Sequence, residues 1–284
     1  MSWDSPIVSC AWLADRLDDQ MVRIVDTRWF LGEPGVGRLR YQKDHIPGAV
    51  FMDLDEDLAA TEGPGRHPLP SREDFADLLG RNGIGNQHQV VVYDQGPGAI
   101  AARLWWMLRS VGHFSVSVLD GGYGKWLDKG HPIDSSEPLV THCVFTVDTG
   151  PTRIVDRDRL LERLGSVQVL DAREPERYRG EIEPIDQVAG HIPTALPSPV
   201  AENVNPDGTF KSASALAARF AEMGLDPNLP VVSYCGSGVT ACHNLMALQM
   251  AGFSEGILYP GSWSDWSSSG MPIATGPDPG SPPA

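Results

Sequence analysis

Short runs of β-branched and aliphatic residues alternate with amphipathic stretches along the whole chain. Between these runs, residues 71–83 and 212–224 show the apolar spacing of helices, and each stretch opens with serine and closes with glycine, as helix caps commonly do. Strand–helix alternation predicts an α/β fold with parallel sheets, whose functional loops lie at the carboxyl ends of the strands. Six runs have the length and composition of buried strands: 24–25, 90–93, 116–119, 169–170, 231–234 and 257–259.

The chain also repeats itself. Five motifs occur twice in the same order: VRIVDTR and VQVLDAR, DHIPGAV and GHIPTAL, VVVYD and VVSYC, DGGYGKW and YPGSWSDW, GHPI and GMPI. Such ordered repetition predicts two homologous domains, which agrees with the chain length of 284 residues. We place the first domain at 1–142 and the second at 153–284, with a connection at 140–153. The Pro/Gly-rich tail, 274–284, is expected to be disordered.

Composition narrows the possible functions. The chain has 22 Lys and Arg against 37 Asp and Glu, a formal net charge of −15, which disfavours nucleic-acid binding because phosphates would be repelled. No apolar run reaches the length of a membrane span, and the first residues lack the pattern of a secretory signal. The four cysteines at positions 10, 143, 235 and 242 match neither a disulfide framework nor a zinc site. We therefore expect a cytoplasmic globular protein without a metal site, in which one cysteine could be reactive.

The two repeats differ at the residue that follows the VVxY strand, which is Asp94 in the first repeat and Cys235 in the second. A short glycine-bearing loop and an amphipathic helix follow Cys235, so backbone N–H groups at the helix N-terminus would surround the sulfur and favour its thiolate form. Gly236 and Gly238 allow the loop to curl with its amides inward. We therefore predict a nucleophilic cysteine in the second domain and an inert first domain.

Two chemistries use such a loop. A cysteine phosphatase needs an arginine six positions after its nucleophile to clamp the phosphate, and Ala241 stands there. Sulfur transfer needs no such arginine, because the amides and hydroxyls of residues 235–240 could stabilise a persulfide. The phosphatase therefore remains only a distant alternative.

At this point the sequence resembles a known family. The tandem domains, the two HIP motifs, the YPGSWSDW segment and the CGSGVT loop are similar to two-domain rhodanese-type sulfurtransferases over residues 5–273. The resemblance implies two tandem rhodanese-like domains, each a mainly parallel sheet flanked by helices, and no metal or organic cofactor. The small, uncharged loop is most similar to that of 3-mercaptopyruvate sulfurtransferases. It implies Cys235 as the persulfide carrier and four loop residues as its contacts: Gly236, Gly238, Val239 and Thr240.

An anionic donor also needs a cationic partner, for which arginine is well suited. The resemblance implies Arg177 as the first substrate arginine, and Arg179 is a second candidate. In mercaptopyruvate enzymes another arginine follows nine residues after the first, but Asp186 stands at that position. The YRGE stretch, 178–181, also occurs in thiosulfate-type relatives. Thiosulfate:cyanide transfer with the same nucleophile therefore stays open.

The resemblance further implies a Ser–His–Asp relay beside the cysteine, formed by Ser237, His67 and Asp53. Such a relay could polarise the carbonyl of the substrate or carry a proton to the enolate that forms as sulfur leaves. By contrast, Arg28, Arg173, His45 and His191 occur at matching places in both repeats. We therefore expect structural roles for these four residues.

These observations predict an enzyme that takes sulfur from a small anionic donor, 3-mercaptopyruvate, and passes it to a thiol, to cyanide or to a dithiol protein. They predict neither nucleic-acid nor membrane partners. A non-catalytic persulfide carrier is the alternative from another class of function.

Overall fold

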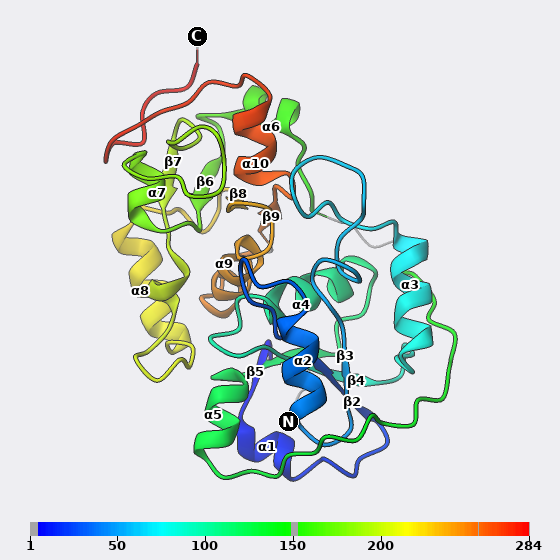
Figure 1. Cartoon of the computed structure of the whole chain (residues 1–284). Coiled ribbons are helices and arrows are strands. Elements are labelled where there is room, and N and C mark those ends of the chain that lie inside the picture. Colours follow the sequence, from blue (N-terminus) through cyan, green and yellow to red (C-terminus); the bar gives the residue numbers. More distant parts are fainter. Residues whose placement is uncertain (1–4, 149–152, 255, 284) are drawn as a thin grey trace. The chain divides into compact units, whose positions relative to one another are not determined.

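A computed structural model of the chain describes residues 5–148, 153–254 and 256–283. The chain folds into two compact units, and their membership interleaves along the sequence (Figure 1). The predicted domains, 1–142 and 153–284, are contiguous, whereas each unit includes a short segment from the other half of the chain. Unit 1 comprises residues 1–60, 69–152 and 205–210, and unit 2 comprises residues 61–68, 153–204 and 211–284.

Unit 1 is built on a five-stranded sheet in the order β1-β5-β4-β2-β3, in which every neighbouring pair is parallel. Strands β4 and β5 are buried along their whole length and consist mainly of apolar residues, as expected for a parallel sheet that is covered on both faces. The strands are β1 (Ile7–Val8), β2 (Val22–Asp26), β3 (Ala49–Phe51), β4 (Gln89–Tyr93) and β5 (Val116–Leu119).

Unit 2 repeats this topology with a four-stranded parallel sheet in the order β7-β6-β8-β9, which matches β3-β2-β4-β5 of unit 1. Where β1 pairs with β5 in unit 1, an isolated parallel bridge joins Ile154 to Leu258 in unit 2. The two sheets confirm the predicted α/β fold and its duplication. The strands are β6 (Gln168–Asp171), β7 (Ala195–Pro197), β8 (Val231–Tyr234) and β9 (Ile257–Leu258).

Two helices begin and end where the sequence predicts caps. Ser71 and Ser212 accept hydrogen bonds from the third residue of their helices, α3 and α8, and each chain reversal that follows contains a glycine with positive φ. Unit 1 contains α1 (Cys10–Ala14), α2 (Val36–Lys43), α3 (Arg72–Arg81), α4 (Ala101–Ser110) and α5 (Gly122–Asp128). Unit 2 contains α6 (Arg157–Arg163), α7 (Pro175–Arg179), the 3₁₀ helix η1 (Val200–Asn203), α8 (Ala213–Glu222), α9 (Ala241–Met250) and α10 (Ser262–Ser268).

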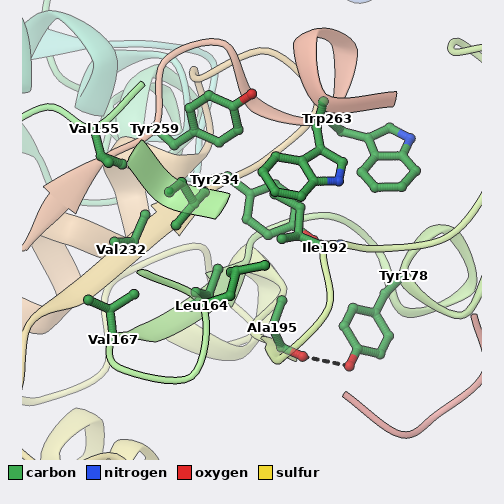
Figure 2. Close-up of a cluster of buried hydrophobic side chains, with 13 residues drawn as sticks. Val155, Leu164, Val167, Tyr178, Ile192, Ala195, Val232, Tyr234, Tyr259 and Trp263 are labelled. Atoms are coloured by element: carbon green, nitrogen blue, oxygen red, sulfur yellow. Dashed lines mark hydrogen bonds between the residues drawn. The ribbon is translucent and has the colours of Figure 1, made fainter. Parts of the chain in front are cut away.

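Each unit has its own hydrophobic core. In unit 2, side chains from β6, β8 and α10 pack together, and the Tyr178 hydroxyl donates a 2.7 Å hydrogen bond to the Ala195 carbonyl at the edge of this cluster (Figure 2). Trp126 and Trp266 hold equivalent places in the two cores, and each indole N–H donates a 2.8 Å hydrogen bond to a proline carbonyl. The duplication therefore extends from the strands to individual buried side chains.

The residues shared by both repeats make equivalent buried contacts in the two units. Arg28 pairs with Asp26, and Arg173 pairs with Asp171, in each case with both side chains buried. His45 and His191 stack on Tyr41 and Tyr178, and each ring Nδ1 lies within 2.8 Å of the carbonyl of that tyrosine. The structural roles expected for these four residues are confirmed.

Two segments differ from their expectations. The tail after residue 273 packs on unit 2, where Ala274 bridges His191 and Gly276 donates a hydrogen bond to the Arg179 carbonyl, although its composition predicts disorder. Of the predicted connection 140–153, the first part is hydrogen-bonded to unit 1 through Cys143 and Asp148, and residues 149–152 lie outside the described residues.

Candidate active site

Cys235 lies directly after β8, at the carboxyl end of a central strand of unit 2, and its side chain is nearly inaccessible, at 2% exposure. The loop 235–240 connects this strand to α9. Within it, the Gly238 N–H donates a 3.1 Å hydrogen bond to the Cys235 sulfur. The carbonyls of Val239 and Thr240 accept hydrogen bonds from the N–H groups of the second and third residues of α9, so the loop is continuous with the helix. The sulfur therefore accepts one backbone N–H within a loop that leads directly into the N-terminus of α9.

The start of α10 fixes the orientation of this loop. Trp263 N–H donates to the Cys235 carbonyl and Ser264 N–H donates to the Gly236 carbonyl, both at 2.9 Å. In a trans peptide the N–H points opposite to the C=O. The amides that follow these two carbonyls therefore point away from α10. Ser262 completes the anchor, because its hydroxyl accepts a 3.1 Å hydrogen bond from the Cys235 N–H.

Gly238 is required at its position for two reasons. Its φ is +77°, and a Cβ atom added there would lie 2.4 Å from the Pro260 carbonyl oxygen. A side chain at residue 238 would therefore displace either the loop or the segment before α10. The loop can curl around the cysteine because this residue has no side chain.

In unit 1, the equivalent strand, loop and helix surround a carboxylate. Asp94, after β4, occupies the position that Cys235 has after β8. One carboxylate oxygen accepts from Gly96 and Gly98 at 2.7 and 3.0 Å, and the other accepts from Ile100 and Ala101 at 2.8 and 3.1 Å. Four backbone N–H groups thus converge on one buried negative group, as expected at a helix N-terminus. The geometry can therefore hold an anion.

His67 contacts Ser237, which belongs to the cysteine loop. The Nδ1 atom of His67 lies 2.7 Å from the Ser237 hydroxyl oxygen. The segment Thr61–Pro68 belongs to unit 2 although it comes from the first half of the chain. It is anchored to the start of α10, because the Arg66 N–H donates a 3.1 Å hydrogen bond to the Ser264 hydroxyl. The structure therefore brings together two of the three predicted relay residues.

Asp53, the third predicted relay residue, lies in unit 1 after β3. It is buried, and its Oδ1 accepts hydrogen bonds from the N–H groups of Asp55 and Glu56 at 2.8 and 3.3 Å. Its place in the relay stays a prediction.

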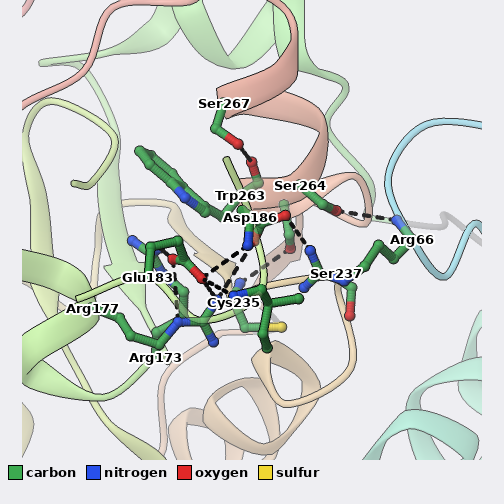
Figure 3. Close-up of polar contacts among 12 residues, drawn as sticks. Arg66, Arg173, Arg177, Glu183, Asp186, Cys235, Ser237, Trp263, Ser264 and Ser267 are labelled. Atoms are coloured by element: carbon green, nitrogen blue, oxygen red, sulfur yellow. Dashed lines mark hydrogen bonds and ion pairs between the residues drawn. The ribbon is translucent and has the colours of Figure 1, made fainter. Parts of the chain in front are cut away.

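Arg177, on α7, is held beside the loop by acidic side chains (Figure 3). Its Nη2 lies 2.6 Å from one oxygen of Glu183, and its Nε lies 3.2 Å from the other. Glu183 also accepts a 3.2 Å hydrogen bond from Arg173, which is itself paired with Asp171. This pairing network orients the Arg177 guanidinium and keeps a buried cation at the site.

Arg66, which no sequence motif singles out, also lies at the candidate site. Its guanidinium forms an ion pair with Asp186, whose other oxygen lies 3.5 Å from Nη2 of Arg177. Burial raises the pKa of the Asp186 carboxyl, an effect that the neighbouring Arg66 partly offsets and that Glu183 reinforces. The acidic residue at position 186 could have signalled this cation, because a half-buried carboxylate next to a site for anions needs a positive partner.

Arg179 has a different neighbourhood from Arg177. It forms ion pairs with Glu181 at 2.7 Å and with Glu176 at 3.7 Å. Both glutamates are well exposed, so we assign Arg179 and its two ion pairs to the surface of α7 and the turn that follows it.

Across residues 5–148, 153–254 and 256–283, no cluster of His, Cys, Asp and Glu side chains is arranged to hold a metal ion. Within the same ranges, no helix is long and apolar enough to cross a membrane.

The chain is similar in sequence to known proteins over most of its length. The rhodanese-like domain family matches residues 9–129 and 156–269. A protein of Pseudomonas aeruginosa named "Probable 3-mercaptopyruvate sulfurtransferase" is 42% identical over 95% of this chain and 98% of its own length. The thiosulfate sulfurtransferase of Rattus norvegicus is 36% identical over 92% of this chain and 91% of its own length.

Solved structures have the same architecture. The 3-mercaptopyruvate sulfurtransferase from Leishmania major superposes with a TM-score of 0.82 at 29% identity, over 93% of this chain and 75% of that one. The family match, the sequence identity and the fold therefore indicate the same family. The chain is a member of the rhodanese-like family of sulfurtransferases.

Proposed function

We propose that the protein transfers sulfur from 3-mercaptopyruvate to a thiol, cyanide or dithiol-protein acceptor through a persulfide on Cys235. One observation carries this proposal: the Cys235 sulfur accepts the Gly238 N–H inside a loop of small, uncharged residues. Such a loop can stabilise the terminal sulfur of a persulfide by its amides, as the four amides around Asp94 stabilise a carboxylate.

In the first half-reaction, the Cys235 thiolate attacks the sulfur of the donor. The new S–S bond forms as the C–S bond of the donor breaks, and the electron pair of that bond becomes the enolate of pyruvate. The proton from the donor thiol ends on the enolate carbon, so pyruvate leaves and a Cys235 persulfide anion remains. Atoms and charge balance without an oxidant or a metal.

In this proposal the Ser237–His67 pair moves that proton. The 2.7 Å contact between the two side chains supports proton exchange between them, and Ser237 belongs to the loop that holds the sulfur. A hydroxyl and an imidazole in contact can take a proton from one atom and deliver it to another during the reaction.

In the second half-reaction, a nucleophile removes the outer sulfur. Cyanide attacks the terminal sulfur, the S–S bond breaks, thiocyanate leaves and the Cys235 thiolate returns. A small thiol or a reduced dithiol protein would take the sulfur in the same way. We further propose a cytoplasmic location, because all four cysteines are free and the catalytic thiol has to stay reduced.

Intact-mass spectrometry after exposure to 3-mercaptopyruvate tests this function. We expect one added sulfur atom on the wild type, stoichiometric release of pyruvate and loss of the added mass on addition of cyanide. Cys235→Ser should gain nothing, whereas Cys143→Ser, which removes a thiol of unit 1, should behave as the wild type. Sulfur that still appears on the Cys235→Ser protein would sink the proposal.

Thiosulfate is the competing donor, because relatives with either name match at the same level of identity. The Cys235 thiolate would then displace sulfite instead of an enolate, and no proton would have to reach carbon. Comparing kcat/KM for the two donors decides between them. A persulfide that forms but is not turned over by any small acceptor would instead favour the carrier function.

A further inference from the structure

Two guanidinium groups approach the residue next to the nucleophile. A Cβ atom added to Gly236 would lie 2.8 Å from Nη2 of Arg66 and 3.7 Å from both Nη atoms of Arg177. Arg177 comes from α7, and Arg66 comes from the segment Thr61–Pro68. Both cations therefore lie over the backbone that carries the reacting sulfur.

Asp186 explains how Arg66 reaches this place. One carboxylate oxygen pairs with Arg66 and the other lies 3.5 Å from Arg177, so the carboxylate bridges the two guanidinium groups. Asp186 stands where the family resemblance places an arginine. Asp186 therefore holds Arg66, from the segment Thr61–Pro68, beside Arg177. The site thus has a second cation although position 186 is not an arginine.

The two arginines differ in their freedom. The Arg177 side chain is 10% exposed and is also held by Glu183, whereas the Arg66 side chain is 32% exposed. A guanidinium has five N–H donors in a planar fork, so Arg66 can keep its bond to Asp186 and still bind a second carboxylate. An incoming anion reaches Arg66 more easily than the better-buried Arg177.

We propose that Arg66 is a specificity-determining residue that binds the carboxylate of 2-oxo acid donors together with Arg177, and that Asp186 holds it in position. This inference rests on the proposed function. It deepens that function by assigning the second cation of the donor site to a residue outside the repeated motifs. It also predicts that a donor whose carboxylate is masked as a neutral ester gains nothing from Arg66.

The test compares 3-mercaptopyruvate with its methyl ester, which keeps the sulfur and the ketone but lacks the carboxylate charge. For Arg66→Gln we expect the kcat/KM ratio of acid to ester to fall about tenfold, with the ester rate unchanged, because a charge-assisted hydrogen bond is lost. Arg66→Lys, which keeps the charge but not the fork, should fall between the two. The control is Arg159→Gln, an exposed arginine of the same unit, which should match the wild type.

Pyruvate binding, measured by calorimetry, gives a second arm that needs no turnover. We expect Arg66→Gln to weaken pyruvate binding about tenfold and Arg159→Gln to leave it unchanged. If the wild type forms no persulfide from 3-mercaptopyruvate, the proposed function fails and the pyruvate arm alone decides on Arg66. An acid-to-ester ratio and a pyruvate affinity that both survive Arg66→Gln would overturn the inference. An equal loss for both donors would reduce Arg66 to a structural role and would also overturn it.

Discussion

The Nδ1 atom of His67 lies 2.7 Å from the Oγ atom of Ser237, although 170 positions separate the two residues in the sequence. The loop that contains His67 is held against α10 independently of this contact, through the Arg66 N–H and the Ser264 hydroxyl. The serine lies two residues after the nucleophile, and the histidine is delivered from a distant segment. The pair can therefore be removed without removing the sulfur or the loop that carries it.

The first prediction concerns this pair. His67→Asn should lower the single-turnover rate of persulfide formation from 3-mercaptopyruvate about a hundredfold, because the enolate loses its proton donor. The rate with thiosulfate should change little, since sulfite needs no proton on carbon. Stopped-flow measurement with each donor checks this, with the exposed His142→Asn as the control. An equal loss with both donors would argue for a positioning role instead.

The second prediction separates backbone strain from collision in the cysteine loop. Gly238→Ala and Gly252→Ala both place alanine at a positive φ, of +77° and +85°, but an added Cβ meets another atom within 4 Å only at residue 238. Gly252→Ala should cost about 1 kcal/mol of unfolding free energy and keep persulfide formation. Gly238→Ala should cost more and abolish persulfide formation. Denaturant unfolding and intact mass measure the two effects, and equal behaviour of the two variants would contradict the prediction.

The third prediction concerns the carboxylate of unit 1. Asp94→Asn should lower the unfolding free energy by about 2–3 kcal/mol, because an amide N–H₂ would face backbone donors that a carboxylate oxygen now accepts. Persulfide formation on Cys235 in the folded protein should persist. The exposed Asp77→Asn is the control for loss of a carboxylate. Unchanged stability in Asp94→Asn would show that these four hydrogen bonds contribute nothing.

The fourth prediction is a pH dependence of stability. Burial lowers the pKa of His191 below its ordinary value of 6.5, although the bond to the Tyr178 carbonyl partly offsets this effect. The unfolded chain therefore binds a proton more readily than the folded one, so the contribution of His191 to stability is present above pH 6.5 and is lost as the pH falls below it.

Comparison of the wild type with His191→Gln isolates this contribution. The difference in unfolding free energy between them should shrink as the pH is lowered from about 7.5 to about 5.5. Denaturant titrations at several pH values measure it. A difference that stays constant or grows on acidification would refute the assignment.

Much of the fold follows from local patterns. The run Val231–Tyr234 is β8 itself, and the serine-to-glycine stretch 71–83 contains α3, because burial and capping act within a few residues. The strands β1, β3 and β7 are not among the predicted runs. Each has only two or three residues, and β7 contains a proline, so their identity depends on pairing with β5, β2 and β6 and not on their own pattern.

The candidate site likewise contains some residues that local sequence predicts and others that only the folded chain brings together. Cys235 and its loop could be predicted because strand, glycines and helix are contiguous there. Arg66 could not, because its partner Asp186 is 120 positions away and only the folded chain brings the two together. In the sequence, Asp186 stands for the loss of an expected cation, whereas in the structure that acid pairs with Arg66 from another segment.

Each unit contains a segment from the other half of the chain, so the boundaries of a fragment decide which residues of the candidate site it contains. A fragment beginning at residue 153 would keep Cys235, Arg177 and the whole of the second sheet, yet it would lack Thr61–Pro68 and with it Arg66 and His67. The unit that contains Cys235 takes eight of its residues, 61–68, from the other half of the chain. The two repeats are therefore not separable modules, and only the undivided polypeptide contains every residue of the candidate site.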